Sequence, residues 1–322
     1  MLSLTFLGTS AARPTVERGV SSIALQREGE MMLFDCGEGT QRQMMRYGVG
    51  FSFAEIFFTH FHSDHFLGVV GLARTLGLQG RTEPLTLYGP RGAEGILRPA
   101  LELGVERPAF PVEIRELSPG DALRRPGYVL EVVAGDHGGG ALCYALREPP
   151  RLGRFDPEVA RAMGIPEGPL WGRLHKGEAV EWEDRSGGEV VKRTATPDAL
   201  VGTPRPGRLV VISGDTRPCE RVVRVATGAD LLVHEATFTE EEKERAVETR
   251  HSTAREAAQV ALAAGVKRLA LTHLSARFSA QWGPLLDEAR EVFPETVVAK
   301  DGLALEVGFD ESADPRSAPA ST

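Results

Sequence analysis

The chain has little of several residue types whose abundance would point to a particular class of protein. It contains 3 cysteines and 3 tryptophans in 322 residues, and no apolar run is long enough to span a membrane. The cysteines (Cys36, Cys143 and Cys219) are far apart and odd in number, so they predict neither a disulfide framework nor a C-x-x-C metal site. Residues 1–8 are typical of a first strand rather than a signal peptide. These absences predict a soluble protein with no membrane partner, in the reducing cytoplasm.

Positive charge is also in short supply. The sequence holds 37 lysines and arginines against 45 aspartates and glutamates, which gives a formal net charge of −8. Nucleic-acid partners usually require a basic face, so the net charge taken alone argues against one. A site that carries its own divalent cations escapes this argument, because bound ions dominate the local field.

Histidine is scarce as well, and its distribution is uneven. Three of the 8 histidines fall within residues 59–65, in the pattern H-x-H-x-D-H formed by His60, His62, Asp64 and His65. The apolar run just before this stretch predicts a buried strand, so the pattern leaves a strand end. Imidazole and carboxylate suit zinc and similar divalent metals, and the spacing predicts one loop that serves two ions. The alternative is a polar turn whose histidines cap helices or bond to the backbone.

Further polar side chains follow other predicted strands. The residues concerned are His137 after 128–133, Asp215 after 209–212, His234 and Glu235 after 231–233, and His273 after 269–271. Catalytic residues tend to lie where a rigid scaffold gives way to a loop. One such histidine would more often be an ordinary surface residue, but their recurrence beside the H-x-H-x-D-H loop predicts a shared site. His234 is expected to be structural.

The number of candidate ligands matches a site for two ions, which needs roughly three protein ligands for each ion and a bridge. One allocation gives His60, His62 and His137 to the first ion, Asp64, His65 and His273 to the second, and makes Asp215 the bridge. A water shared by the ions would have its pKa brought near neutrality and would act as a nucleophile.

The composition changes between Pro149 and Gly207, where prolines recur and charges alternate. The segment is too long for a simple loop in a compact domain, so it predicts an inserted arm or lid. A disordered linker is the alternative, although the large apolar side chains of Leu170, Trp171 and Leu174 argue against it.

The predicted domain plan follows from this change in composition. Residues 1–148 and 207–310 are expected to form the catalytic domain, 149–206 a flexible protruding arm, and 311–322 a frayed tail. The downstream half alternates strands and helices. Thr253 and Glu256 predict a capping box for a helix over 254–264 that ends at Gly265.

The metal motif resembles the signature of the metallo-β-lactamase fold, and further motifs resemble ribonuclease Z, the tRNA 3′-processing endonuclease. The resemblance covers about residues 1–308. The motifs that carry the narrower likeness are Phe6-Leu7-Gly8-Thr9-Ser10-Ala11, Phe34-Asp35-Cys36-Gly37-Glu38-Gly39-Thr40-Gln41, Ser213-Gly214-Asp215-Thr216-Arg217, His234-Glu235-Ala236-Thr237-Phe238, His251-Ser252-Thr253 and Leu271-Thr272-His273-Leu274-Ser275-Ala276-Arg277.

The resemblance implies an α/β (α+β) fold, a four-layer αβ/βα sandwich with an inserted arm. It implies two Zn²⁺ per subunit, with other divalent metals possible, and cleavage of precursor tRNA after the discriminator base to leave a 3′-hydroxyl. It also implies a homodimer in which the arm of one subunit holds the tRNA for the active site of its partner. Neither DNA nor a membrane is an expected partner.

Three residues, Asp64, His251 and Glu235, are predicted to form the catalytic group. Asp64 would hold the attacking water as well as a metal, and His251 would protonate the leaving oxygen with Glu235 as its orienting partner. The helix that starts after Thr253 disfavours a charged His251, whereas Glu235 favours it, so the balance predicts a pKa near neutrality. The alternative is an exposed residue before a helix.

The candidate contacts to tRNA lie mainly in the insertion. The resemblance makes Gly168, Pro169, Arg173 and Lys176 parts of the exosite. Charge beside the ring of Trp171 suits an RNA backbone, although a solvated charge run with a tucked tryptophan would look the same. Arg277 is a candidate contact to the scissile phosphate, unless it only pairs with a nearby acid.

Two other functions stay open at the level of sequence. The chain could be a hydrolase of the same fold that acts on a small phosphodiester or a thioester, which would have no need of the insertion. It could also be a non-catalytic, metal-stabilised RNA-binding or scaffold protein, although the full ligand set argues against this.

Overall fold

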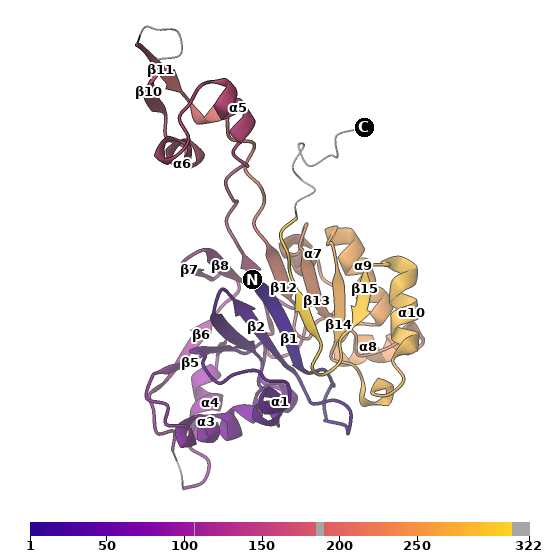
Figure 1. Cartoon of the computed structure of the whole chain (residues 1–322). Helices are drawn as coiled ribbons and strands as arrows, with labels where there is room; N and C mark the ends of the chain where they lie inside the picture. Colours follow the sequence, from indigo (N-terminus) through magenta and orange to yellow (C-terminus); the bar gives the residue numbers. More distant parts are fainter. Residues whose placement is uncertain (106, 185–189, 311–322) are drawn as a thin grey trace. The chain divides into compact units, whose positions relative to one another are not determined.

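Two large mixed sheets form the frame of the molecule in a computed structural model that describes residues 1–105, 107–184 and 190–310 (Figure 1). The first sheet has the order β16-β1-β2-β3-β4-β5-β6. Its strands are β1 (Leu2–Gly8), β2 (Ser22–Arg27), β3 (Glu30–Phe34), β4 (Glu55–Phe57), β5 (Leu85–Pro90), β6 (Val112–Leu117) and β16 (Ala304–Glu306). The last described strand therefore returns to pair with the first.

The second sheet has the order β15-β14-β13-β12-β9-β8-β7. Its strands are β7 (Ala122–Arg125), β8 (Tyr128–Ala134), β9 (Leu142–Arg147), β12 (Leu209–Ile212), β13 (Leu231–Glu235), β14 (Leu269–Thr272) and β15 (Thr296–Val298). The strands from β12 to β15 run parallel to one another, so their carboxyl ends share one edge.

The helices cover the outer faces of the two sheets (Figure 1). Those on the first sheet are α1 (Thr40–Arg46), α2 (Ser63–Phe66), α3 (Gly68–Leu78) and α4 (Ala93–Leu101). Those on the second are α7 (Glu220–Val225), α9 (Ala254–Ala264) and α10 (Gly283–Val292). The chain between β13 and α9 forms the 3-10 turn η2 (Glu240–Glu242) and α8 (Lys243–Thr249), and the 3-10 turn η3 (Ala276–Phe278) follows β14. None of the described helices has the length and apolar character needed to cross a membrane.

Three apolar clusters separate these layers. Aromatic side chains fill the space between the two sheets, where Phe57 stacks on Tyr88 with ring centroids 4.7 Å apart and packs against the ring of Tyr144 at 5.6 Å. The other two clusters lie beneath the helices on either side. A central strand that is covered on both faces is apolar throughout, as β12 (Leu209–Ile212) shows. The predicted four-layer αβ/βα sandwich is confirmed.

The helix predicted over 254–264 is present with both of its predicted ends. The Thr253 hydroxyl accepts a hydrogen bond from the backbone N–H of Glu256 at 3.1 Å, and the Glu256 carboxylate accepts one from the backbone N–H of Thr253 at 3.0 Å. Gly265 follows in the left-handed conformation, with φ of 60°. The cap fixes the start of α9, and therefore the segment just before it.

The chain forms two compact units rather than one. The larger consists of Met1–Arg147 and Leu209–Gly308, and the smaller of Glu148–Arg208 with residues 309 and 310. The smaller unit contains α5 (Pro157–Ala162), α6 (Pro169–His175), β10 (Val180–Asp184), β11 (Val191–Ala195) and the 3-10 turn η1 (Pro197–Ala199). It has a core of its own, formed by Ala160, Ile165, Leu174, Val180, Trp182, Ala195 and Leu200. The interpretation of this segment as a disordered linker is therefore wrong for its described residues.

The boundaries of the units differ slightly from the predicted ones, and Phe309 explains part of the difference. The guanidinium groups of Arg151 and Arg208 lie 3.6 and 4.1 Å from the centroid of its ring, which ties residues 309 and 310 to the smaller unit rather than to the catalytic domain. The predicted tail, 311–322, lies outside the described residues, as do 185–189 of the predicted insertion.

The backbones at Gly68 and Gly37 approach each other closely, so a substitution at Gly68 tests the packing of the fold. A Cβ atom there would lie 1.8 Å from the carbonyl oxygen of Gly37, so Gly68→Ala should lower the free energy of unfolding by about 1–3 kcal/mol. Gly95→Ala is the matched control, since its Cβ meets nothing within 4 Å in the exposed face of α4, and should raise stability by about 0.5–1 kcal/mol. Urea unfolding of both variants measures the difference; a Gly68→Ala protein as stable as wild type would contradict the packing.

Candidate metal centre and active site

Hydrogen bonds from both sheets fix the loop that carries the H-x-H-x-D-H motif. The loop starts at Phe58, just after β4, where the backbone N–H of Phe58 donates to the carbonyl oxygen of Tyr88 at 2.8 Å. The hydroxyl of Tyr144, from the opposite sheet, donates to the carbonyl oxygen of Phe58 at 2.6 Å. The N–H of Leu142 donates to the carbonyl oxygen of Thr59 at 2.8 Å. The loop therefore leaves its strand in a direction that both sheets determine.

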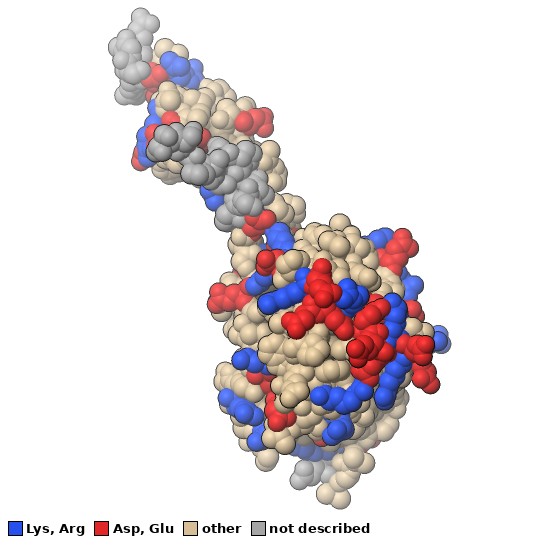
Figure 2. All heavy atoms as spheres, turned by 90° about the vertical axis from the view of Figure 1, so that its right-hand side faces the viewer, with Lys and Arg blue, Asp and Glu red and all other residues tan. Residues whose placement is uncertain are grey.

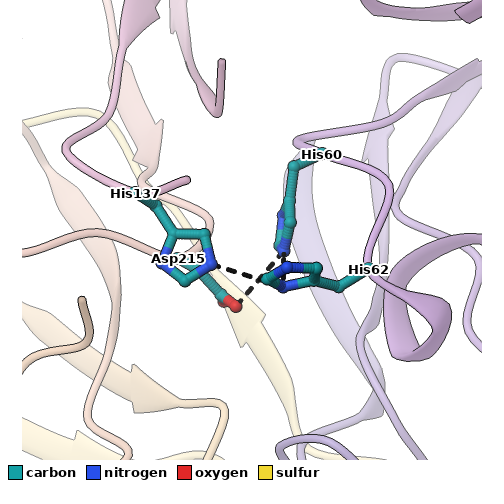
Figure 3. A group of neighbouring side chains, drawn as sticks. All are labelled: His60, His62, His137 and Asp215. Carbon is teal, nitrogen blue, oxygen red and sulfur yellow. Dashed lines mark hydrogen bonds and ion pairs between the residues drawn. The ribbon is translucent and has the colours of Figure 1, made fainter. Parts of the chain in front are cut away.

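The first group of candidate ligands brings together three predicted histidines and the predicted bridge (Figure 3). The Nδ1 atom of His62 lies 3.0 Å from Nε2 of His60 and 3.3 Å from Nε2 of His137. The Oδ2 atom of Asp215 lies 3.5 Å from Nε2 of His60. Four donor atoms from three separate loops thus converge on one point, in the combination predicted for the first ion.

The second group consists of the other three predicted ligands. The Nε2 atom of His273 lies 3.3 Å from both Nε2 of His65 and Oδ2 of Asp64. The Oδ2 atom of Asp215 is 3.3 Å from His65 and 3.4 Å from His273, so this carboxylate touches both groups. Asp215 therefore lies close to candidate ligands of both predicted ions.

The unsatisfied oxygen of Asp215 fits a bound cation. The side chain is 2% exposed, and its Oδ1 atom has no hydrogen-bond partner among the described residues. A buried carboxylate oxygen without a partner costs free energy, and a metal ion at this point would remove the cost. The nitrogen and oxygen donors suit a divalent metal, so the described residues can hold one.

The second nitrogen of several of these imidazoles is held by a partner outside the two groups. His65 Nδ1 donates to Asp35 Oδ2 at 2.8 Å, and His137 Nδ1 donates to the carbonyl oxygen of Arg250 at 2.7 Å. His273 Nδ1 lies 3.0 Å from the hydroxyl of Thr237. Such partners orient the rings so that Nε2 of His65 lies next to His273 and Nε2 of His137 next to His62.

The surroundings of the site favour the ligand forms of His60 and Asp215. Burial lowers the pKa of His60 well below its usual value, which keeps this imidazole neutral. Burial would raise the pKa of Asp215, but the imidazoles of His273, His65 and His60 outweigh it and hold the pKa well below the usual range. For His65 the carboxylates of Asp215 and Asp35 outweigh burial and raise the pKa. A divalent ion would displace that proton from His65.

His251 lies at the edge of the same cluster, and Glu235 holds it there. Its Nδ1 atom donates to Glu235 Oε1 at 2.9 Å, and its ring centroid is 5.3 Å from that of His273. Burial lowers the pKa of His251, but the Glu235 carboxylate outweighs burial and raises it to about 9. Glu235 therefore dominates the predicted balance at His251, because its carboxylate is fully buried. Divalent cations nearby would oppose the shift.

A cavity of about 430 Å³ opens over these groups. His62, Asp64, Asp215, His251 and His273 line it, together with Arg277 and the ring of Phe238. The Arg277 guanidinium pairs with Glu242 at 2.5 Å, as its alternative interpretation predicted, and still faces the cavity. A guanidinium has five N–H donors, so this ion pair leaves donors for a phosphate.

The four predicted exosite residues lie together in the smaller unit, at α6. Gly168 precedes the helix, Pro169 is its first residue, and Arg173 and Lys176 are exposed near its end. Trp171 is partly buried: its indole N–H donates to the carbonyl oxygen of Ile165 at 3.2 Å, and its ring packs on Phe155 with centroids 5.4 Å apart. These contacts are those expected of a tucked tryptophan.

The chain is similar over almost its whole length to proteins of one family. The chain is 56% identical to the ribonuclease Z of Gemmatimonas aurantiaca over 312 residues, and this alignment covers 96% of this chain and 97% of that protein. It is 51% identical over 310 residues to the ribonuclease Z of Haloferax volcanii, with 96% of both chains covered. The chain belongs to the ribonuclease Z family.

The architecture of this ribonuclease Z family member is similar to that of solved structures. The short form of human tRNase Z superposes with a TM-score of 0.67 at 27% identity, over 95% of this chain and 100% of that one. The metallo-β-lactamase fold protein YhfI of Bacillus subtilis gives a TM-score of 0.65 at 18% identity, over 94% and 98% of the two chains, and so shares the fold. A family model described as anti-Pycsar protein Apyc1 matches residues 2–111.

Several residues that support the site of this ribonuclease Z family member were not predicted from the sequence. Asp35 accepts the hydrogen bond from His65 and also one from the backbone N–H of Thr59 at 2.7 Å. The hydroxyl of Thr237 donates to Glu235 at 2.8 Å, and the backbone N–H of Ala12 donates to Asp64 Oδ2 at 2.7 Å. Only Asp35 and Thr237 stand in motifs that could have drawn attention to them, because a backbone N–H leaves no trace in a sequence.

Asp215→Asn tests the bridging position. The amide keeps the shape of the side chain but lacks the negative charge, so we expect bound metal to fall by at least one ion per chain in elemental analysis. Chelation should also lower the melting temperature of this variant less than that of wild type, since ions bound to the folded state stabilise it.

The matched control is Asp121→Asn, an exposed aspartate in the turn before β7. It should bind metal as wild type does. An Asp215→Asn protein with the full metal content would contradict the bridging assignment.

Proposed function

We propose that this chain is a metal-dependent endoribonuclease that removes the 3′ trailer of precursor tRNA by hydrolysis after the discriminator base, leaving a 3′-hydroxyl. The observation that carries the proposal is the convergence of the two ligand groups with the His251–Glu235 pair at one cavity, in a ribonuclease Z family member. The metal ligands would be His60, His62, His137, Asp64, His65 and His273, with Asp215 as the bridge. Two Zn²⁺ per subunit, or other divalent metals, would fill them.

Two such cations would supply a nucleophile from water near neutral pH and neutralise charge on the phosphate oxygens. The protein's own groups would do the rest. Asp64 is positioned to orient the attacking water, since the N–H of Ala12 fixes its Oδ2 atom. Arg277 would contact a phosphate oxygen from the wall of the cavity.

His251 would act as the general acid. Its Nδ1 atom is engaged with Glu235, so the proton for the leaving 3′-oxygen would come from Nε2. Glu235 is itself held by the backbone N–H of Thr216 at 3.0 Å and by the Thr237 hydroxyl, which fixes the direction of the imidazole. A positioned acid of this kind contributes about 10²–10⁴-fold to a rate.

Incubation with a 3′-extended precursor tRNA tests the reaction. Wild type should cut once, after the discriminator base, and a chelator should abolish the cut. His251→Ala should lower kcat by about 10²–10⁴-fold on this substrate. It should leave bis(4-nitrophenyl) phosphate hydrolysis nearly unchanged, because nitrophenolate departs without a proton.

The outcome separates the open functions. Hydrolysis of the small phosphodiester without any tRNA cleavage would favour a small-substrate hydrolase. Binding of tRNA without either activity, in protein that holds metal, would favour a non-catalytic RNA-binding protein.

We further propose that the smaller unit is a tRNA exosite in a homodimer, with Gly168, Pro169, Arg173 and Lys176 at α6 as contacts. Arg173 and Lys176 place cationic groups at an exposed helix end, where phosphates of a folded RNA can reach them. The reaction is assigned to the cytoplasm, where Cys36, Cys143 and Cys219, which form no disulfide, would stay reduced.

Replacement of residues 152–204 by a short turn tests the exosite. Arg151 and Arg205 exchange backbone hydrogen bonds at 2.7 and 2.9 Å, and Arg147 pairs with Leu209, so the cut ends are adjacent and can close as a hairpin. The shortened protein should lose precursor tRNA cleavage and keep hydrolysis of bis(4-nitrophenyl) phosphate. If both activities survived, the exosite proposal would be wrong.

Mixing this shortened protein with full-length His251→Ala tests the dimer. Alone, the shortened protein should not cleave precursor tRNA, and His251→Ala should cleave it only at its lowered rate. If the exosite of one subunit serves the other, mixed dimers contain one intact site with an exosite beside it, and cleavage should return. Failure to recover activity in dimers verified by sedimentation would show that each subunit uses its own exosite.

A further inference from the structure

Arg217 joins three loops of the site without being a candidate ligand or lining the cavity. Its guanidinium donates to both carboxylate oxygens of Glu256, at 2.7 Å from Nη1 and 2.5 Å from Nη2. Nη1 also donates to the backbone carbonyl oxygen of His251 at 2.6 Å. The pair is largely buried, with side-chain exposures of 16% and 6%, so solvent weakens these charge-assisted bonds little.

The backbone around Arg217 holds the other two loops. Its own N–H donates to the carbonyl oxygen of Asp136 at 3.0 Å, and the N–H of Asp136 donates to the hydroxyl of Thr216 at 2.8 Å. The Ser252 hydroxyl donates to the carbonyl oxygen of Thr216 at 2.6 Å. The turn that carries Asp215 is therefore bonded to the loop of His137 on one side and to the loop of His251 on the other.

The other partner of the guanidinium is equally well fixed. Glu256 Oε2, which accepts from Arg217, also accepts from the backbone N–H of Thr253 in the capping box of α9. The Glu256 carboxylate thus holds the start of α9 directly and the carbonyl oxygen of His251 through Arg217. This matters because His251 follows Arg250, which has a positive φ of 59°, in the short loop between α8 and α9.

We propose that Arg217 is a positioning residue that sets the place of His251 relative to the metal ligands. It acts through the carbonyl oxygen of His251, and it fixes the imidazole beside Asp215, whose Oδ2 atom lies 3.9 Å from Nδ1 of His251. The inference rests on the proposed role of His251 as the acid. The planar fork of a guanidinium can bind two carboxylate oxygens and a carbonyl together, whereas an ammonium cannot reproduce this geometry.

The test compares Arg217→Gln and Arg217→Lys with the control Arg255→Gln, a more exposed arginine of α9 that pairs with Glu291. In the full-length enzyme, kcat for precursor tRNA should fall about 10–100-fold in Arg217→Gln, as expected for a small displacement of a catalytic group. Arg217→Lys keeps a charge for Glu256 and should lie between this variant and wild type. KM, bound metal and bis(4-nitrophenyl) phosphate hydrolysis should stay at wild-type values, and Arg255→Gln should match wild type throughout.

The double variant Arg217→Gln/His251→Ala provides the decisive measurement. If Arg217 acts through His251, the double variant should be no slower than His251→Ala alone, because the two changes remove the same contribution. A further loss in the double variant, or a loss of metal or of small-substrate activity in both single Arg217 variants, would overturn the inference.

The same data keep the inference apart from the proposed function. If His251→Ala cleaves precursor tRNA as wild type does, the assignment of the acid is wrong, and the role of Arg217 falls with it. If His251→Ala is impaired while both Arg217 variants have wild-type kcat, only the inference about Arg217 is wrong.

Discussion

The site depends on one buried carboxylate that lies among imidazoles. Asp215 touches His60, His65 and His273 at 3.3–3.5 Å and keeps an oxygen without a partner among the described residues. Burial of such a group is costly unless cations compensate it, so the protein must supply protonated histidines or metal ions at this point. The imidazoles of the two ligand groups meet that requirement, and Asp215 joins the groups because it contacts members of both.

The two-sheet sandwich makes this arrangement possible. The first sheet contributes the loop after β4, while the second contributes His137 after β8, Asp215 after β12 and His273 after β14. Because β12 and β14 belong to a run of parallel strands, their carboxyl ends share one edge of the second sheet. Aromatic packing between the sheets and the bond from Tyr144 to Phe58 hold the two edges in register.

Much of this site could be predicted from the sequence, and the limits of the prediction have physical causes. The residue type determines the ligand chemistry, so an H-x-H-x-D-H loop and a set of strand-end histidines predict a metal centre. The strength of an interaction depends on burial, which the sequence does not show. The sequence paired Glu235 with His251 but did not show that this carboxylate is fully buried, and it did not show that Trp171 packs against the small core of its unit.

The sequence by itself determined the chemical identity of the centre, the family and the capped start of α9, because each depends on residue types at short spacing. Only the tertiary structure decided which donor atoms meet and which partner fixes each imidazole. It also decided which hydrogen bonds join Thr216 and Arg217 to the loops of His137 and His251. Those relations join residues far apart in the chain, such as Asp64 and His273, and several use backbone groups. A backbone N–H or carbonyl is the same at every position, so only folding can give it a specific role.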